Sequence, residues 1–97
     1  MADTANVPTY EKDPDDILDF HWNWRPYLSD GELITASEFL VTAGVTIGPT
    51  PPSSTTQDAT LWLSGGDIGQ VYRCTNRITT NQGRQVDRSI NVRVKDL

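Results

Sequence analysis

The sequence predicts an all-β fold, a small immunoglobulin-like β-sandwich of about six or seven antiparallel strands with an extended N-terminal arm. The first observation is that apolar and polar residues alternate in short segments, as in strands with one buried face. The second is that turn-forming residues separate these segments at intervals of about ten residues. The third is size, because 97 residues form one domain that buries roughly two thirds of its unfolded surface.

The clearest β signal is residues 61–94, which predict three consecutive strands. Alternating apolar residues mark each strand, and two glycine-containing segments, residues 64–67 and 81–84, separate them. Glycine supplies the positive φ angles that tight hairpin connections require, so we expect two hairpins in series. One apolar face of this ribbon then needs a second sheet to cover it.

Residues 17–24 predict the most regular strand of the chain. One face carries Leu18, Phe20, Trp22 and Trp24, and the other carries Asp19, His21, Asn23 and Arg25. We expect the four large apolar side chains to form the floor of the core. The alternative is a solvent-exposed aromatic platform that stacks on sugars.

Residues 32–41 change their apolar phase partway along. This change predicts a β-bulge, or a strand that passes from one sheet to the other, near Ser37 and Glu38. A short helix is the competing interpretation, which the β-branched residues and the β context disfavour. Residues 45–47 predict one further strand, and residues 50–58 predict a polar loop that leads to residues 59–64, the first strand of the ribbon.

The N-terminal residues show no periodicity. We expect residues 1–13 to form an extended arm and residues 14–97 to form the single β-sandwich domain. The arm is either disordered or ordered on a neighbouring subunit, where Val7, Tyr10 and its acidic residues would supply contacts. It has neither the basic start nor the apolar centre of a signal peptide, and the chain contains no apolar run that spans a membrane, so we expect a cytosolic protein.

Charge is distributed unevenly along the chain. The net charge of −5 disfavours nucleic-acid binding. Residues 1–38 contain nine acidic and two basic side chains, a net of −7, whereas residues 69–97 contain six basic and two acidic side chains, a net of +4. Opposite charges of this kind are neutralised either within the fold or between copies in head-to-tail contact.

Motifs for catalysis, cofactors and metals are missing from the sequence. Residues 65–69 have neither dinucleotide-binding nor P-loop spacing, and the carboxylates of residues 13–16 do not fit an EF-hand because Leu18 stands where that loop needs glycine. His21 is the only histidine, and Cys74, the only cysteine, has the phase of a core residue. We therefore expect no enzyme activity, no cofactor and no metal.

Several segments together resemble a known family. They are residues 12–16 followed by an aromatic strand, residues 62–66, Tyr72, residues 75–80, Gly83 with Arg84, and residues 87–90. The chain is similar over residues 12–95 to small virion proteins of tailed bacteriophages, the fiber-tail adaptor family. The resemblance implies a β-sandwich that joins fibers or other appendages to the tail or baseplate, with no catalytic or ligand-binding residues to transfer.

We hypothesise that copies of such a domain assemble into a ring in which the acidic N-terminal half of one copy faces the basic C-terminal strands of the next. The candidate interface residues are Tyr10, Asp13, Asp15, Asp16, Asp19, Arg73, Arg77, Arg84 and Arg93. Arg88 is a further candidate, but it falls on the apolar phase, so the alternative is a partly buried arginine paired within the domain, with an N-terminal aspartate. The partners implied are other virion proteins, whether tail, baseplate, portal or fiber, in a virion assembled in the host cytoplasm.

Two rival interpretations remain open. A capsid decoration or head-tail connector protein needs the same stable domain and adhesive edges. A carbohydrate-binding or host-receptor-binding module would use Trp62, Tyr27 and the loop at residues 50–58 as its recognition surface.

Overall fold

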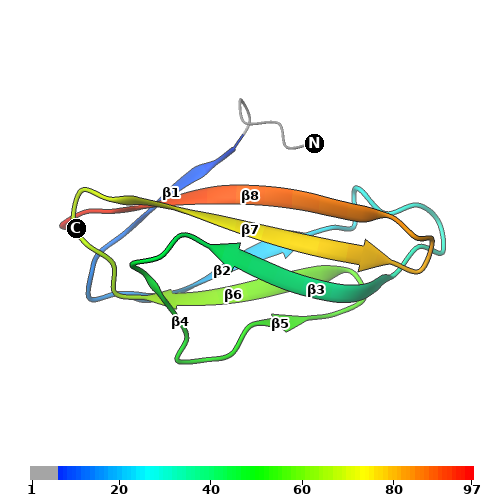
Figure 1. Ribbon diagram of the computed structural model, residues 1–97, viewed down its shortest axis with the longest axis horizontal. Coiled ribbons are helices and arrows are strands. Elements are labelled where there is room, and N and C mark those ends of the chain that lie inside the picture. The colour runs from blue at the N-terminus through cyan, green and yellow to red at the C-terminus, as the bar shows by residue number, and fades with distance from the viewer. Residues whose placement is uncertain (1–6) are drawn as a thin grey trace.

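The computed structural model describes residues 7–97 and confirms the all-β fold (Figure 1). Its eight strands, two of them only two residues long, are β1 (Thr9–Lys12), β2 (Ile17–Asn23), β3 (Ile34–Val41), β4 (Thr46–Ile47), β5 (Ser53–Ser54), β6 (Asp58–Ser64), β7 (Val71–Thr80) and β8 (Gln85–Val94). The polar loop predicted over residues 50–58 thus contains the short strand β5, which pairs with β6 beside the prolines.

The strands form two sheets that face each other. The first sheet has the order β1-β8-β7-β3, and the second has the order β2-β6-β4, with β5 also paired to β6. The pairings are antiparallel except that of β1 with β8, which is parallel. The domain measures 43 × 29 × 19 Å, with the strands running roughly along its longest dimension (Figure 1).

The core fills the space between the sheets. Its buried side chains are Phe20, Trp22, Trp24, Ile34, Ala59, Leu61, Leu63, Cys74, Ile78, Ile90 and Val92. The predicted floor is confirmed for the three aromatic residues of residues 17–24, with Leu18 half-buried beside them, while the opposite face is exposed. The alternative prediction of an exposed aromatic platform on this strand is therefore wrong. Cys74 is fully buried, as its phase predicts.

The two predicted hairpins have different outcomes. The turn at residues 81–84 does join β7 to β8 as an antiparallel pair, and Gly83 has a φ of 82°. The segment at residues 64–67 does not form a hairpin, because β6 lies in the second sheet and the chain crosses here to the first. Gly65 and Gly66 have positive φ angles as expected, but the conformation of a turn does not decide which strands pair.

The irregularity predicted in residues 32–41 is present at a different place. The register of β3 against β7 shifts between Ile34 and Ala36, not near Ser37 and Glu38, and the strand stays in one sheet. The shift exchanges the buried phase, since Ile34 points inward whereas Ala36 is exposed and Phe39 is half-buried. The small side chain of Ala36 gains little from burial, so it follows the outward phase despite being apolar.

Part of the segment expected to be an arm belongs to the first sheet. Residues 1–6 lie outside the described residues, while residues 9–12 form the edge strand β1 beside β8. Lys12 is fully buried, and its Nζ donates to the carbonyl oxygens of Asp13 at 2.9 Å and Gly65 at 2.7 Å. The sequence gives no strand signal here because the inward position is taken by a charged residue.

Candidate interaction surfaces

Arg77, a predicted interface arginine, is paired within the domain. Its Nε and Nη2 donate to the two carboxylate oxygens of Asp87 on β8 at 2.9 and 3.0 Å, and its Nη1 lies 3.9 Å from Glu38 on β3. The hydrogen bonds from Arg77 hold the pKa of Asp87 below its usual value. This arginine therefore links three strands on the outer face of the first sheet.

Arg84, another predicted interface arginine, is also paired internally. Its Nε donates to Oε2 of Glu32 at 2.8 Å and its Nη2 to Oε1, while the hydroxyl of Thr80 donates to Oε2 at 2.7 Å and the amide of Ser29 to Oε1 at 3.0 Å. Hydrogen bonds, that from Arg84 first, lower the pKa of the buried Glu32 to about 2. The charge of Arg84 is thus neutralised at the turn end of the sandwich.

Arg88 differs from the expectation of a partly buried arginine paired with an N-terminal aspartate. It is exposed, and its guanidinium lies 5.2 Å from the ring centre of Tyr27 and 5.6 Å from that of Trp24. Its Nη1 donates to the backbone carbonyl of Asp87 at 2.9 Å, and within residues 7–97 it forms no ion pair with a carboxylate. The aromatic rings attract the cation in place of an aspartate.

Tyr27 and Trp62, the aromatic residues of the receptor-binding alternative, do not share a surface. Tyr27 is half-buried against Trp24 and stacks under Arg84 at 4.4 Å. Trp62 lies on the outer face of the second sheet, where it pairs across the strands with Asp19. The two rings therefore do not form one recognition surface with the loop at residues 50–58.

Asp13 and Asp16 hold a turn rather than facing away from the domain. Oδ1 of Asp13 accepts a hydrogen bond from the amide of Asp15 at 2.9 Å, its Oδ2 accepts one from the amide of Leu97 at 3.0 Å, and Oδ2 of Asp16 accepts one from the amide of Asp13. These backbone donors lower the pKa of Asp13. The two carboxylates thus fix the β1–β2 turn and tie the C-terminus to it.

Arg73 and Arg93 form a basic pair on the outer face of the first sheet. Arg73 pairs with Asn91 across β7 and β8, and Val71 pairs with Arg93 two residues further along, so the two arginines are diagonal neighbours. Within residues 7–97 neither arginine forms an ion pair. Val71 beside them is 44% exposed, so this face combines positive charge with an open apolar side chain.

Asp15, Asp19 and Tyr10 complete the set of predicted interface residues. Asp15 is exposed in the β1–β2 turn, and Asp19 is exposed on the outer face of the second sheet, as is Ile17 at 52%. Tyr10 faces the seam between the sheets, with its ring centre 5.9 Å from that of Phe20. The structure therefore places Arg73 and Arg93 on the outer face of the first sheet and Asp19 on the outer face of the second.

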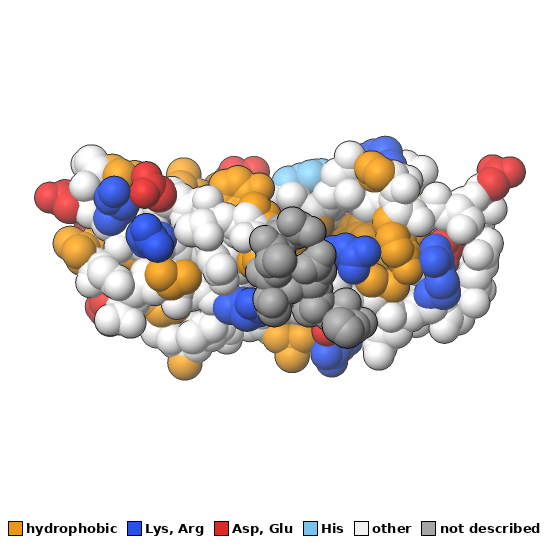
Figure 2. All heavy atoms as spheres, turned by 90° about the horizontal axis from the view of Figure 1, so that it is seen from above, with side chains coloured by type: hydrophobic (Ala, Val, Ile, Leu, Met, Phe, Trp, Pro, Cys, Tyr) orange, Lys and Arg blue, Asp and Glu red, His pale blue; other side chains and the backbone are white. Residues whose placement is uncertain are grey.

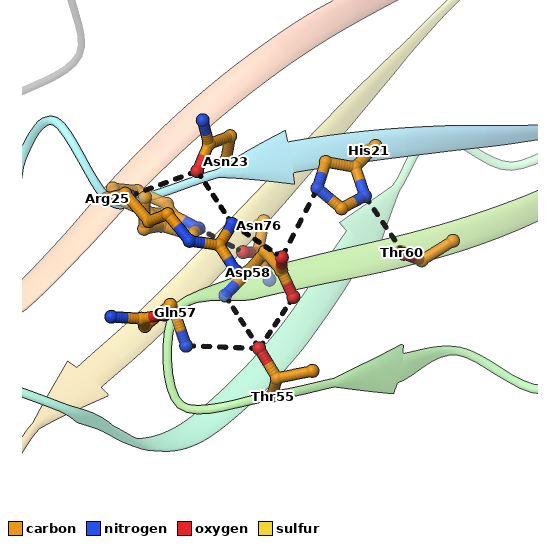
Figure 3. A network of polar contacts seen from close by, with 9 residues as sticks. His21, Asn23, Arg25, Thr55, Gln57, Asp58, Thr60 and Asn76 are labelled. Carbon is orange, nitrogen blue, oxygen red and sulfur yellow. Dashed lines mark hydrogen bonds and ion pairs between the residues drawn. The ribbon is translucent and has the colours of Figure 1, made fainter.

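A polar network that sequence reasoning missed lies on the outer face of the second sheet (Figure 3). Asp58 accepts hydrogen bonds from the hydroxyl of Thr55 at 2.6 Å and Nη1 of Arg25 at 2.9 Å, and lies 3.5 Å from Nε2 of His21. The Nδ1 of His21 is 3.3 Å from the hydroxyl of Thr60. The network joins β2 to the start of β6, and the bond from Thr55 is the main cause that lowers the pKa of Asp58.

This row of hydroxyl, imidazole and carboxylate connects β2 to the start of β6. Asp58 is shared by Thr55, Arg25 and His21 instead of orienting the imidazole alone. Its members come from two segments, residues 21–25 and residues 55–60, and the pairing of β2 with β6 brings these segments together. Among residues 7–97, no group of three or more His, Cys, Asp or Glu side chains is arranged to hold a metal ion.

A disulfide-free β-sandwich with internally paired charge clusters and charged, partly apolar outer faces has the surfaces of a binding domain. Residues 12–93 match the family of the podophage GP4 fiber-tail adaptor protein gp77, and the chain belongs to this family. The family resemblance predicted from the sequence is therefore confirmed. A comparison with curated proteins finds no match.

Membership in an adaptor family fits the surfaces described above. Membership in a fiber-tail adaptor family implies a component of the phage virion that contacts other tail and fiber proteins. The match begins at Lys12, so most of β1 lies outside it. In the described part of the chain, no helix has the length and apolar character needed to cross a membrane.

Proposed function

We propose that this domain is a non-enzymatic adaptor whose copies contact one another in the tail and present a joint surface to fibers or other appendages. The observation that carries the proposal is the position of the unpaired charges. Arg73 and Arg93 lie on the outer face of the first sheet, and Asp19 lies on the outer face of the second. A contact between two different faces is heterologous, and such contacts generate rings when the rotation closes.

The apolar neighbours of these charges support the same contact. Val71 pairs with Arg93 on the basic face, and Ile17 is two residues from Asp19 on the acidic face. Stacking one face on the other would cover both exposed side chains and bring the arginines to the aspartates. Of the nine candidate residues, this contact uses four: Arg73, Arg93, Asp15 and Asp19. The other five make contacts within the domain: Tyr10, Arg77, Arg84, Asp13 and Asp16.

Light scattering after size exclusion, at low and high salt, tests the proposal. The wild-type chain is expected to form a defined oligomer that salt weakens, because salt screens exposed charges. The Arg73→Glu/Arg93→Glu variant is expected to be monomeric, and adding Asp15→Arg and Asp19→Arg to it is expected to restore the oligomer. A wild-type chain that stays monomeric at every salt and concentration, or a variant that assembles unchanged, would overturn the self-assembly.

A further inference from the structure

The edge of the first sheet is open along half of β8. β1 covers β8 only over the registers Thr9↔Asn91 to Lys12↔Val94, so within residues 7–97 no strand pairs with residues 85–90 of β8 on the side opposite β7. The amide of Asn91 donates to the carbonyl of Pro8 at 2.8 Å, which shows that this residue's backbone groups point to the edge. Those of Ser89 and Asp87 point the same way, because alternate residues of a strand share a direction.

Pro8 explains why β1 stops where it does. Its carbonyl accepts the Asn91 bond, but proline has no N–H to continue the parallel ladder toward Ser89. An exposed strand edge with unpaired donors and acceptors is a template for another strand. β1 itself shows that the adjacent half of this edge accepts one.

Side chains along the open half indicate what kind of strand fits. Positions that pair with β8 have side chains on the same face as their partners, so an added strand would point inward opposite Val86, Arg88 and Ile90. Tyr10, which pairs with Val92, points inward in this way and contacts Phe20. Seen from this side, hydrophobic and basic side chains lie next to each other on the surface (Figure 2).

Arg88 supplies the charge preference. Its guanidinium is exposed over Tyr27 and Trp24 and has no carboxylate partner within residues 7–97. Its Nη1 donates a hydrogen bond to the backbone carbonyl of Asp87, which is one of the acceptors on this edge. An acidic side chain opposite Arg88 would draw the guanidinium away and free that carbonyl for the added strand.

We infer that the open edge of β8 binds an extended segment of another virion protein by β-strand addition, with an acidic residue opposite Arg88 flanked by apolar residues opposite Val86 and Ile90. The inference rests on the proposed adaptor function only for the origin of the strand. Backbone hydrogen bonds would provide affinity, and the three inward side chains would provide specificity. The outer face with Arg73 and Arg93 is not part of this edge, so the two surfaces can be tested separately.

A palindromic peptide, Thr-Val-Thr-Glu-Thr-Val-Thr, is the probe, since it presents the same inward side chains in either strand direction. Titrated into the 15N-labelled full chain, it is expected to shift and protect the amides of Asp87 and Ser89 and to shift the indole signals of Trp22 and Trp24. The same peptide with lysine in place of glutamate is expected to bind at least about tenfold more weakly. A peptide N-methylated on its bonding edge is expected not to bind.

Two chain variants complete the test. Ser89→Pro removes the donor at the open edge, where proline is tolerated, and is expected to abolish peptide binding while leaving the fold and the oligomer intact. Arg88→Glu is expected to reverse the preference toward the lysine peptide, and Lys95→Gln is the control that binds like wild type. Equal binding of both peptides, or protection of the Ser89 amide in the free chain by an occupant already present, would overturn the inference.

Discussion

Arg84 and Glu32, which are far apart in the sequence, form an ion pair in which Nε of the arginine lies 2.8 Å from Oε2 of the buried carboxylate. The bond joins the β7–β8 turn to the segment that leads into β3. The amide of Ser29 and the hydroxyl of Thr80 complete the site, so the charged carboxylate is fully supplied with donors. Burial is favourable only for this ionised and paired state.

The stability of the fold should therefore depend on the protonation of Glu32. Its pKa in the folded chain is about 2, against an ordinary value of 4.5, so its contribution is complete above 4.5 and is lost as the pH falls toward 2. The Glu32→Gln variant should be less stable than wild type near neutral pH, with a difference that shrinks as the pH falls through this window. Urea denaturation of both proteins at several pH values measures the difference in their free energies of unfolding. A difference that does not change with pH would contradict the prediction.

The contribution of Trp24 to the stability of the fold should come from its indole N–H as well as from its apolar surface. Its Nε1 donates to Oδ1 of the buried Asn76 at 2.9 Å, whose Nδ2 donates to Ser37 and to the carbonyl of Glu38. Trp24→Phe leaves the Asn76 oxygen without this donor and should cost about 1–3 kcal/mol. Trp62→Phe on the outer face is the control. Denaturant midpoints compare them, and equal losses would show that the hydrogen bond adds nothing.

Gly66 should tolerate alanine less well than Gly69. Both have a positive φ, +94° and +90°, so both substitutions carry backbone strain of about 1–3 kcal/mol. A Cβ at Gly66 would lie 2.7 Å from Cγ2 of Val94 and 3.2 Å from Cε2 of Tyr72, whereas a Cβ at Gly69 meets nothing within 4 Å. Thermal unfolding of the two alanine variants should differ by at least about 1 kcal/mol. Equal melting temperatures would argue against the close approach at Gly66.

Lys12 should act as a structural residue that fastens β1. Lys12→Met keeps most of the side-chain volume but leaves the carbonyls of Asp13 and Gly65 without their donor, at a cost of about 1–3 kcal/mol. Exchange of the amides of Asn91 and Lys95, which donate to the carbonyls of Pro8 and Lys12, should accelerate. Glu11→Gln, which removes only the exposed ion pair with Lys95, is the control. Unchanged exchange in the methionine variant would contradict this role.

The thiol of Cys74 should be unreactive in the folded protein. It is fully buried, and burial raises the pKa of its thiol to about 11 from an ordinary 9.0. Because the thiolate is the reacting form, a disulfide reagent should label it only slowly at mildly alkaline pH and at once in denaturant. Rapid labelling of the folded chain would mean that the core opens at β7.

Local patterns were sufficient for the strands that bury one clear apolar face. The alternation around Phe20, Trp22 and Cys74 predicts both the strand and the buried side, because a period of two places every second residue on the same face. β1 has no such pattern, since its buried position is Lys12. A change of apolar phase predicts the bulge in β3. Its position depends on whether burial of the small Ala36 side chain contributes enough free energy to keep that residue on the inner face.

The candidate site was predictable only in its charges. The sequence shows that the N-terminal half is acidic and the C-terminal strands are basic. It does not show that Arg77 and Arg84 are neutralised by Asp87 and Glu32 while Arg73 and Arg93 are left free. Those pairings arise between residues on different strands, and their geometry follows from the register of the sheets.

The all-β fold, the residues of most strands and the family could be predicted from the sequence, because alternation and short motifs are local properties of the chain. The three-dimensional structure was needed to show that the connection after β6 crosses between sheets, that β1 joins β8 in parallel, and that β1 pairs with β8 only beyond Ile90 among residues 7–97. Strand pairing depends on which apolar faces meet in the core, and that choice is made by the whole chain rather than by any one segment.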